Sequence, residues 1–135
     1  MTGHVHPETV PPEHTTPWVR RWLRLEGAAG LALGWFVWQV FGGELLWFVP
    51  LLLVPDVSML GYLRGSRAGA ITYNLAHNWF TGGLVFAAGA YLELDWLAMA
   101  GAILVAHTGI DRLLGYGLKY PTSFQDTHLG RIGRR

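Results

Sequence analysis

Two histidines and two aspartates stand out because they lie inside long apolar stretches. His107 and Asp111 are four residues apart, and Asn74 and His77 are three apart, so each pair would share one face of a helix. Asp56 lies in a separate apolar stretch. Neutral imidazoles and carboxylate oxygens form a ligand set that suits Zn, Mn or Fe. The pattern therefore predicts a divalent metal site with these ligands: Asp56, His77, His107 and Asp111.

A metal held by these residues would polarise a bound water, or a phosphoryl or carbonyl oxygen of a substrate. Glu26, an acid within the first apolar stretch, would then be the general base, and Asn74 would orient the reacting groups. This hypothesis describes a hydrolase-like enzyme that acts on an amphipathic or lipid-soluble substrate.

Two other functions would use the same residues. Without a metal, the acids and imidazoles could relay protons, as in a small proton-coupled carrier. They could also hydrogen-bond across helices and stabilise a structural or partner-binding membrane subunit. Hydrogen bonds of that structural kind more often come from Ser, Thr, Asn or Gln, so several ionisable groups favour a functional site. A carrier this small would have to form a homo-oligomer.

A second group of polar residues follows the last apolar stretch. Arg112, Tyr116 and Lys119 would lie at the mouth of the predicted site, where they could bind a phosphate or carboxylate head group. Positive residues at a membrane boundary also occur simply as anchors. His128 could fold back as an extra ligand or a general acid, or could be an ordinary tail residue.

The elements that must position these residues are four hydrophobic segments. Half of the 135 residues are hydrophobic and only 14% are charged, too few charges to cover a small soluble core. Each segment approaches or exceeds the ~20 residues that cross a bilayer as a helix. Short connections make neighbouring helices antiparallel. We expect an all-α, up-down-up-down, four-helix transmembrane bundle, with segments 18–41, 44–63, 68–92 and 95–118.

Lys and Arg residues set the orientation. They occur at the start of the first segment, between the second and third, and toward the chain's end, and the other two connections have none. We expect a multi-pass protein of the inner (plasma) membrane with both termini cytoplasmic: a disordered tail at 1–17, the membrane domain at 18–120 and a cytoplasmic tail at 121–135. At ~1.5 Å per residue, the predicted site residues lie roughly 10–16 Å below the cytoplasmic surface.

The ends of the second and fourth segments resemble each other. Asp56 begins a stretch that ends in Gly61-Tyr62, and Asp111 begins one that ends in Gly115-Tyr116. Both stretches run toward the cytoplasm, so the bundle could consist of two pseudo-repeated helical hairpins.

Composition also excludes some functions. The chain has no Cys, so it has neither a disulfide framework nor a thiolate metal site. Its basic residues are scattered among loops and ends rather than gathered in a stripe, so we expect no nucleic-acid partner. The expected partners are the lipid bilayer and an amphipathic substrate.

Several stretches between about residues 23 and 134 together form a specific pattern: Arg24-Leu25-Glu26-Gly27, Pro55-Asp56-Val57-Ser58-Met59-Leu60-Gly61-Tyr62, Tyr73-Asn74-Leu75-Ala76-His77, Ala106-His107-Thr108-Gly109-Ile110-Asp111-Arg112, Leu114-Gly115-Tyr116-Gly117-Leu118-Lys119-Tyr120-Pro121, Phe124 and Asp126-Thr127-His128-Leu129-Gly130. On these stretches the sequence resembles a family of small bacterial membrane proteins, domain of unknown function 4260. The resemblance implies the membrane location and the segment boundaries, and it carries no activity.

Overall fold

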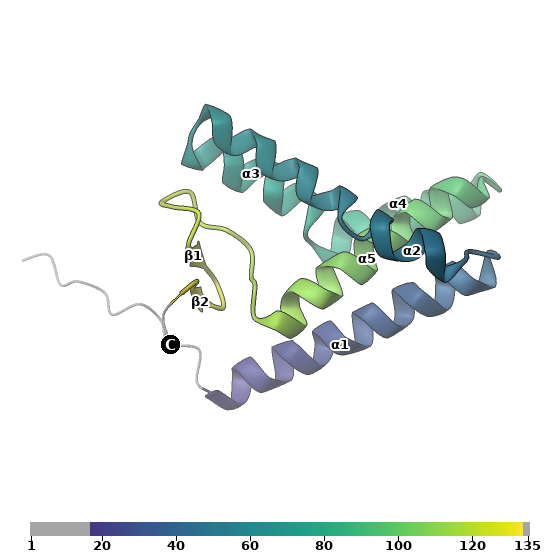
Figure 1. Cartoon of the computed structure of the whole chain (residues 1–135), viewed down its shortest axis with the longest axis horizontal. Helices are drawn as coiled ribbons and strands as arrows, with labels where there is room; N and C mark the ends of the chain where they lie inside the picture. The colour runs from purple at the N-terminus through teal and green to yellow at the C-terminus, as the bar shows by residue number, and fades with distance from the viewer. Residues whose placement is uncertain (1–16, 134–135) are drawn as a thin grey trace, which may run out of the picture.

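The computed structural model describes residues 17–133 (Figure 1). The predicted disordered tail lies outside the described residues except for Pro17, which begins the first helix. The predicted all-α class is confirmed, because residues 17–114 are helical apart from short connections, and the described segment after them, 115–133, adds only turns and a small hairpin. The elements are α1 (Pro17–Val40), α2 (Leu45–Leu51), the 3₁₀ helix η1 (Val54–Arg64), α3 (Ser66–Ala76), α4 (Trp79–Tyr91), α5 (Asp95–Leu114), β1 (Asp126–Thr127) and β2 (Gly130–Arg131).

The segments are less continuous than the sequence predicts. The second is divided into α2 and η1, and the third into α3 and α4. The last helix ends at Leu114, where Gly115 adopts a left-handed conformation with φ 91° and starts the C-terminal segment. The backbones pack most closely in three pairs, which are α1 with α5, α4 with α5, and α3 with η1.

The 3₁₀ helix η1 has three distinct faces, because 3.0 residues per turn align every third side chain. One face packs on α3, where Ser58 accepts a 2.7 Å hydrogen bond from the Thr72 hydroxyl through its carbonyl. A second face, which begins with Asp56, points toward the predicted site. The third face is exposed and wholly apolar: Val54, Val57, Leu60 and Leu63.

The break between α3 and α4 has a local cause at Asn78. Its side-chain oxygen accepts the Thr81 amide at 2.7 Å and caps α4, while its side-chain nitrogen donates to the Asn74 carbonyl at 2.7 Å. One side chain thus satisfies backbone groups on both sides of the break. His77, immediately before Asn78, closes α3 with a non-helical backbone (φ −116°, ψ 40°).

Helices α1 and α5 approach closely because glycines face each other along their contact. A Cβ atom added to Gly109 would lie 2.3 Å from the Leu31 backbone nitrogen, and one added to Gly34 would lie 2.6 Å from the Ala102 carbonyl. Such close approach of small residues is a common way for membrane helices to associate. Next to this contact lies a core cluster of buried residues: Trp38, Phe48, Ile103 and Ala106.

Much of the outer surface is apolar. Two helical stretches, Leu45–Arg64 and Asp95–Leu114, are long and apolar enough to cross a membrane by length and composition. Large apolar side chains are exposed on most helices, and such wide apolar surface is unusual for a soluble monomer. Clear examples are Leu33, Phe36, Leu46, Trp47, Phe80 and Leu84.

The close contact between α1 and α5 predicts a strong effect of Gly109→Ala. The added methyl group would clash with the α1 backbone, so we expect the free energy of unfolding to fall by about 1–3 kcal/mol. Gly83→Ala is the matched control, since nothing lies within 4 Å of its added Cβ on the exposed side of α4. Thermal melting of the purified protein should show a lower Tm for Gly109→Ala alone; equal Tm values would contradict the packing.

Candidate metal centre

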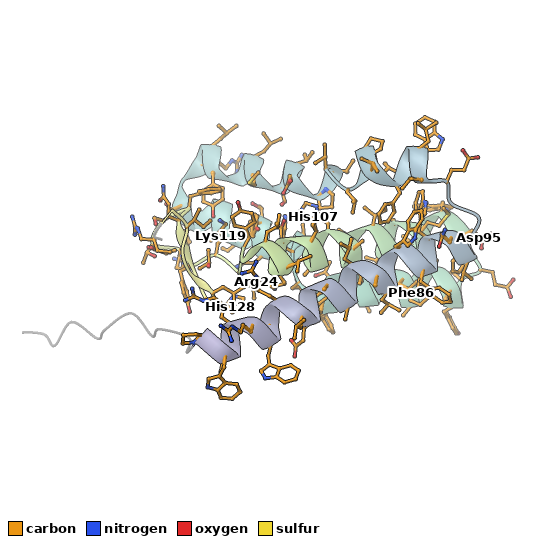
Figure 2. All side chains as sticks on the ribbon, turned by 60° about the horizontal axis from the view of Figure 1, so that its bottom comes forward. Arg24, Phe86, Asp95, His107, Lys119 and His128 are labelled. Atoms are coloured by element: carbon orange, nitrogen blue, oxygen red, sulfur yellow. The ribbon has the colours of Figure 1, made fainter. Side chains whose placement is uncertain are left out.

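The four predicted ligands meet in the middle of the molecule. Asp56 comes from the first turn of η1, His77 from the end of α3, and His107 and Asp111 from one face of α5. Their ligand atoms all lie within 4.8 Å of one another. Figure 2 shows His107 in the interior of the molecule, far from Asp95 at one end and closer to Lys119 toward the other. This convergence confirms that the four residues form one polar group.

Both imidazoles are held by backbone carbonyls. His77 Nδ1 lies 2.8 Å from the Tyr73 carbonyl oxygen, and His107 Nδ1 contacts the Leu52 carbonyl oxygen. A carbonyl oxygen can only accept a hydrogen bond, so each Nδ1 carries the hydrogen. The two Nε2 atoms therefore turn toward each other, and they lie 2.8 Å apart.

The Leu52 carbonyl is available to His107 because of Pro55. In an α-helix this carbonyl would accept from the amide of Asp56, but that amide donates to Leu53 at 3.2 Å. In a 3₁₀ helix it would accept from residue 55, and proline has no amide hydrogen. The start of η1 thus leaves one carbonyl without a helical partner, and His107 takes it.

Two neutral imidazoles that present lone pairs at 2.8 Å repel each other unless a proton or a cation lies between them. The carboxylates supply the balancing negative charge, since Asp56 Oδ1 lies 3.2 Å from His77 Nε2 and 3.1 Å from His107 Nε2. Asp111 Oδ2 lies 3.6 Å from both nitrogens. Tetrahedral coordination with bonds of about 2.0–2.1 Å places ligand atoms about 3.3 Å apart, so the group could hold a metal ion.

Tyr73 belongs to this group, although sequence reasoning missed it. Its hydroxyl donates to Asp111 Oδ2 at 2.9 Å, and its ring stacks on the His77 ring with centroids 3.7 Å apart. Residues 73 and 77 are four apart on α3, so the same helical spacing that paired other residues could have found it. Outer partners of this kind orient metal ligands and fix their tautomers.

A cavity of about 240 Å³ opens beside the cluster. Asp56, Tyr73 and Asp111 line its inner side, and Tyr116 and Lys119 from the C-terminal segment line its outer side. A small polar group could therefore reach both carboxylates without unfolding the bundle.

The structure does not bring Glu26 to the cluster, so the expectation that it acts there as general base is wrong. Its side chain is exposed on α1. The face of α1 that packs on α5 is occupied by Gly27, and the adjacent residue on a helix points about 100° away from its neighbour.

Asn74 has a different contact from the one expected. Its side chain forms two hydrogen bonds with the backbone of Lys119. Nδ2 of Asn74 donates to the Lys119 carbonyl at 2.8 Å, and Oδ1 accepts from the Lys119 backbone amide at 2.7 Å. Asn74 therefore holds the C-terminal segment against α3 rather than pointing into the cluster.

Arg112 is 6% exposed and donates to two backbone carbonyls, those of His77 at 3.1 Å and Tyr116 at 3.2 Å. The guanidinium thus provides a hydrogen-bond donor for the His77 carbonyl, at the break between α3 and α4. This geometry assigns Arg112 a structural contact beside the cluster, and not the expected place at the mouth of the site.

Lys119 is closer to its expected position, since it lines the cavity. Its ammonium donates to the Phe124 carbonyl at 2.8 Å and lies 3.8 Å from the centre of the Phe124 ring. Burial lowers the pKa of Lys119, and the nearby Asp111 carboxylate opposes that shift. An anionic group entering the cavity would meet this cation.

Tyr116 and His128 complete the predicted set. Tyr116 lines the cavity, and its role in binding a substrate stays a prediction. His128 is not among the residues whose ligand atoms converge, and its Nδ1 accepts a 2.8 Å hydrogen bond from the Leu118 amide. Its backbone amide in turn donates to the Leu118 carbonyl at 3.1 Å, so His128 attaches the C-terminal hairpin to Leu118.

Fold and site together define a small, mostly helical protein with a buried His–Asp cluster and a large apolar surface. The chain belongs to the family described as domain of unknown function (DUF4260), whose model matches residues 20–132. No curated protein matches the chain. No solved structure matches it.

Asn74→Ala tests the attachment of the C-terminal segment. It leaves the Lys119 amide and carbonyl without partners, which should cost about 1–3 kcal/mol locally. Hydrogen exchange should be faster at Lys119 and through the following hairpin, with α1 unchanged. Asn74→Asp keeps the acceptor and loses the donor, so its exchange should be intermediate; unchanged exchange in both variants would contradict the contact.

His128 predicts a pH dependence of the same hairpin. Burial, together with the positive Arg112, lowers the pKa of His128 below its ordinary value of 6.5. The unfolded segment therefore binds a proton more readily than the folded one, and local stability falls as the pH drops below about 6.5. Protection of the Leu118 amide, corrected for intrinsic exchange, should decrease in this range. It should vary much less in His128→Gln, and equal pH profiles would contradict the assignment.

Proposed function

We propose that the protein crosses the membrane four times and that its His–Asp cluster binds one divalent transition metal. In this proposal it is a hydrolase-like enzyme that acts on an amphipathic substrate. The single observation that carries it is the pair of imidazoles whose Nδ1 atoms are committed to carbonyls and whose Nε2 atoms face each other at 2.8 Å.

Charge placement supports the membrane topology. Figure 2 shows Arg24, Lys119 and His128 at one end of the molecule and Asp95 at the other. Arg64 ends η1 and Arg67 lies in the first turn of α3, and Figure 1 shows the turn between these two helices at the same end as the start of α1. Lysine and arginine favour the cytoplasmic side, so this end is cytoplasmic and so are both termini. The exposed apolar face of η1 then lies against lipid.

The surroundings of the cluster support an amphipathic substrate. The polar cavity is next to Asp56, and an apolar groove of about 470 Å³ begins at the adjacent residue, Pro55. The groove runs between η1 and α5 and includes Met99, Ile103 and Leu104. A hydrocarbon chain would be solvated in this groove while a polar group lay in the cavity.

The chain's own residues divide the chemical roles. A bound divalent ion would supply Lewis acidity. Asp56, whose side chain is 36% exposed, would accept the proton of an attacking water. Asp111 is 16% exposed and is held by Tyr73, so it serves as a fixed ligand. Lys119 would bind an anionic group of the substrate across the cavity.

A proton relay is the second candidate, and the same short contact supports it. One proton shared between His77 Nε2 and His107 Nε2 would remove the repulsion without a metal, and Asp56 would exchange it with the cavity. In that case the protein is a small proton-coupled carrier.

Metal analysis of the full-length protein, purified in detergent, separates the two candidates. We expect close to one transition-metal ion per chain in the wild type and a loss of at least tenfold in affinity in His107→Ala and in Asp111→Asn. Glu26→Gln is the matched control for Asp111→Asn, because it neutralises an exposed carboxylate outside the cluster.

Metal absent from the wild type, even after incubation with Zn, Mn and Fe, would overturn the metal proposal. Proton flux into liposomes that disappears in His107→Ala would then establish the relay. If the variants change only the melting temperature, with neither metal nor flux, the cluster is a structural element.

A further inference from the structure

A second cavity lies at the cytoplasmic end, and three arginines line it. It has a volume of about 410 Å³ and is formed by the first turns of α1, the end of α5 and the C-terminal hairpin. Arg20 and Arg24 are four residues apart on α1 and therefore share a face, and Arg131 comes from β2. Among the described residues that line this cavity, none carries a negative charge.

The three guanidinium groups are positioned by different contacts. Arg24 Nε donates to the Leu113 carbonyl at 2.8 Å, which fixes the group, and within residues 17–133 its two terminal nitrogens have no hydrogen-bond partner. Arg20 extends over the hairpin, since a Cβ added to Gly130 would lie 3.7 Å from its Nη2. Arg131 is paired with Asp126 through Nη1 at 2.7 Å, so it is partly neutralised.

The depth of this cavity agrees with that of lipid head groups. Trp18 and Trp22, on the same turns of α1, are 64% and 61% exposed. Tryptophan is enriched where a protein surface meets the head-group region. Arginine in turn offers a planar fork of donors that matches the oxygens of a phosphate.

We propose that this three-arginine cavity binds the phosphate group of an anionic phospholipid from the cytoplasmic leaflet. The phosphate contacts the Arg20 and Arg24 guanidinium groups, and Arg131 closes the site from the hairpin. The inference that the phosphate belongs to a lipid rests on the proposed membrane location. The inference that the cavity recognises phosphate rests on the arginines alone and does not depend on the metal.

The cavity also adjoins the one beside the metal cluster. Tyr116 and Ile132 line both. A phosphate bound by the arginines is thus separated from the cluster's cavity by these two side chains, and the bound head group stabilises the hairpin that covers the cluster.

Titration of the full-length protein in a neutral detergent tests this proposal. The probes are a short-chain phosphatidylglycerol, a short-chain phosphatidylcholine and inorganic phosphate, with binding followed by isothermal calorimetry. We expect the phosphatidylglycerol to bind and its affinity to fall about tenfold or more in Arg20→Gln and in Arg131→Gln. Arg67→Gln is the matched control, because it removes an exposed arginine from the same end but outside the cavity.

Equal weakening in Arg67→Gln would overturn the proposal, since general attraction between charges would then explain binding. Absence of binding, or equal affinity for phosphatidylcholine, would also overturn it. If inorganic phosphate binds as tightly, with the same dependence on Arg20, phosphate recognition is supported and the lipid source is overturned. Metal content measured on the same samples shows whether the cluster is intact, so failure here is distinguishable from failure of the proposed function.

Discussion

Buried ionisable side chains need partners, and this requirement joins the two parts of the fold. Helix α5 packs closely on α1 and α4, whereas η1 packs on α3. Between these groups lie the contacts of Asp56 and His77 with His107 and Asp111. A charged or unpaired group there would be costly in an apolar surrounding, so each side chain is satisfied by another from a different element. The cluster is therefore both the candidate site and a main link within the bundle.

Interruptions of the helices serve the cluster directly. Pro55 leaves the Leu52 carbonyl without a helical donor, and that carbonyl fixes the tautomer of His107. The break at His77 exposes another carbonyl, which Arg112 satisfies. Discontinuous helices are found at functional sites within membranes because their free backbone groups are available to bind. In this protein the free groups orient the imidazoles.

The C-terminal segment turns the cluster into a site with a boundary. Asn74 attaches it to α3 through the Lys119 backbone, and Phe124 packs against Tyr62 of η1 with ring centroids 5.3 Å apart. Lys119 and Tyr116 then face the cluster across a small cavity. This segment therefore lies between the cavity beside the carboxylates and the three-arginine cavity, and its residues line both cavities.

The sequence by itself determined the helical class and the residues of the cluster. Ionisable groups inside apolar segments must turn toward each other, and the spacing of His107 and Asp111 places both on one face of a helix. The same rule failed for Glu26, which lies on the exposed face of α1. The face of α1 toward α5 is packed so closely at Gly27 that it leaves no room for a side chain.

Tertiary structure alone decided how these residues are held. The sequence predicted one continuous helix at 44–63, whereas the three faces of η1 depend on α3 packing against Ser58 and Gly61. Contacts between Asn74 and Lys119, or between Arg20 and the hairpin, join residues far apart in the chain, and no local pattern specifies them. Local spacing fixes which side chains share a face, whereas partners across the bundle follow only from how the helices pack.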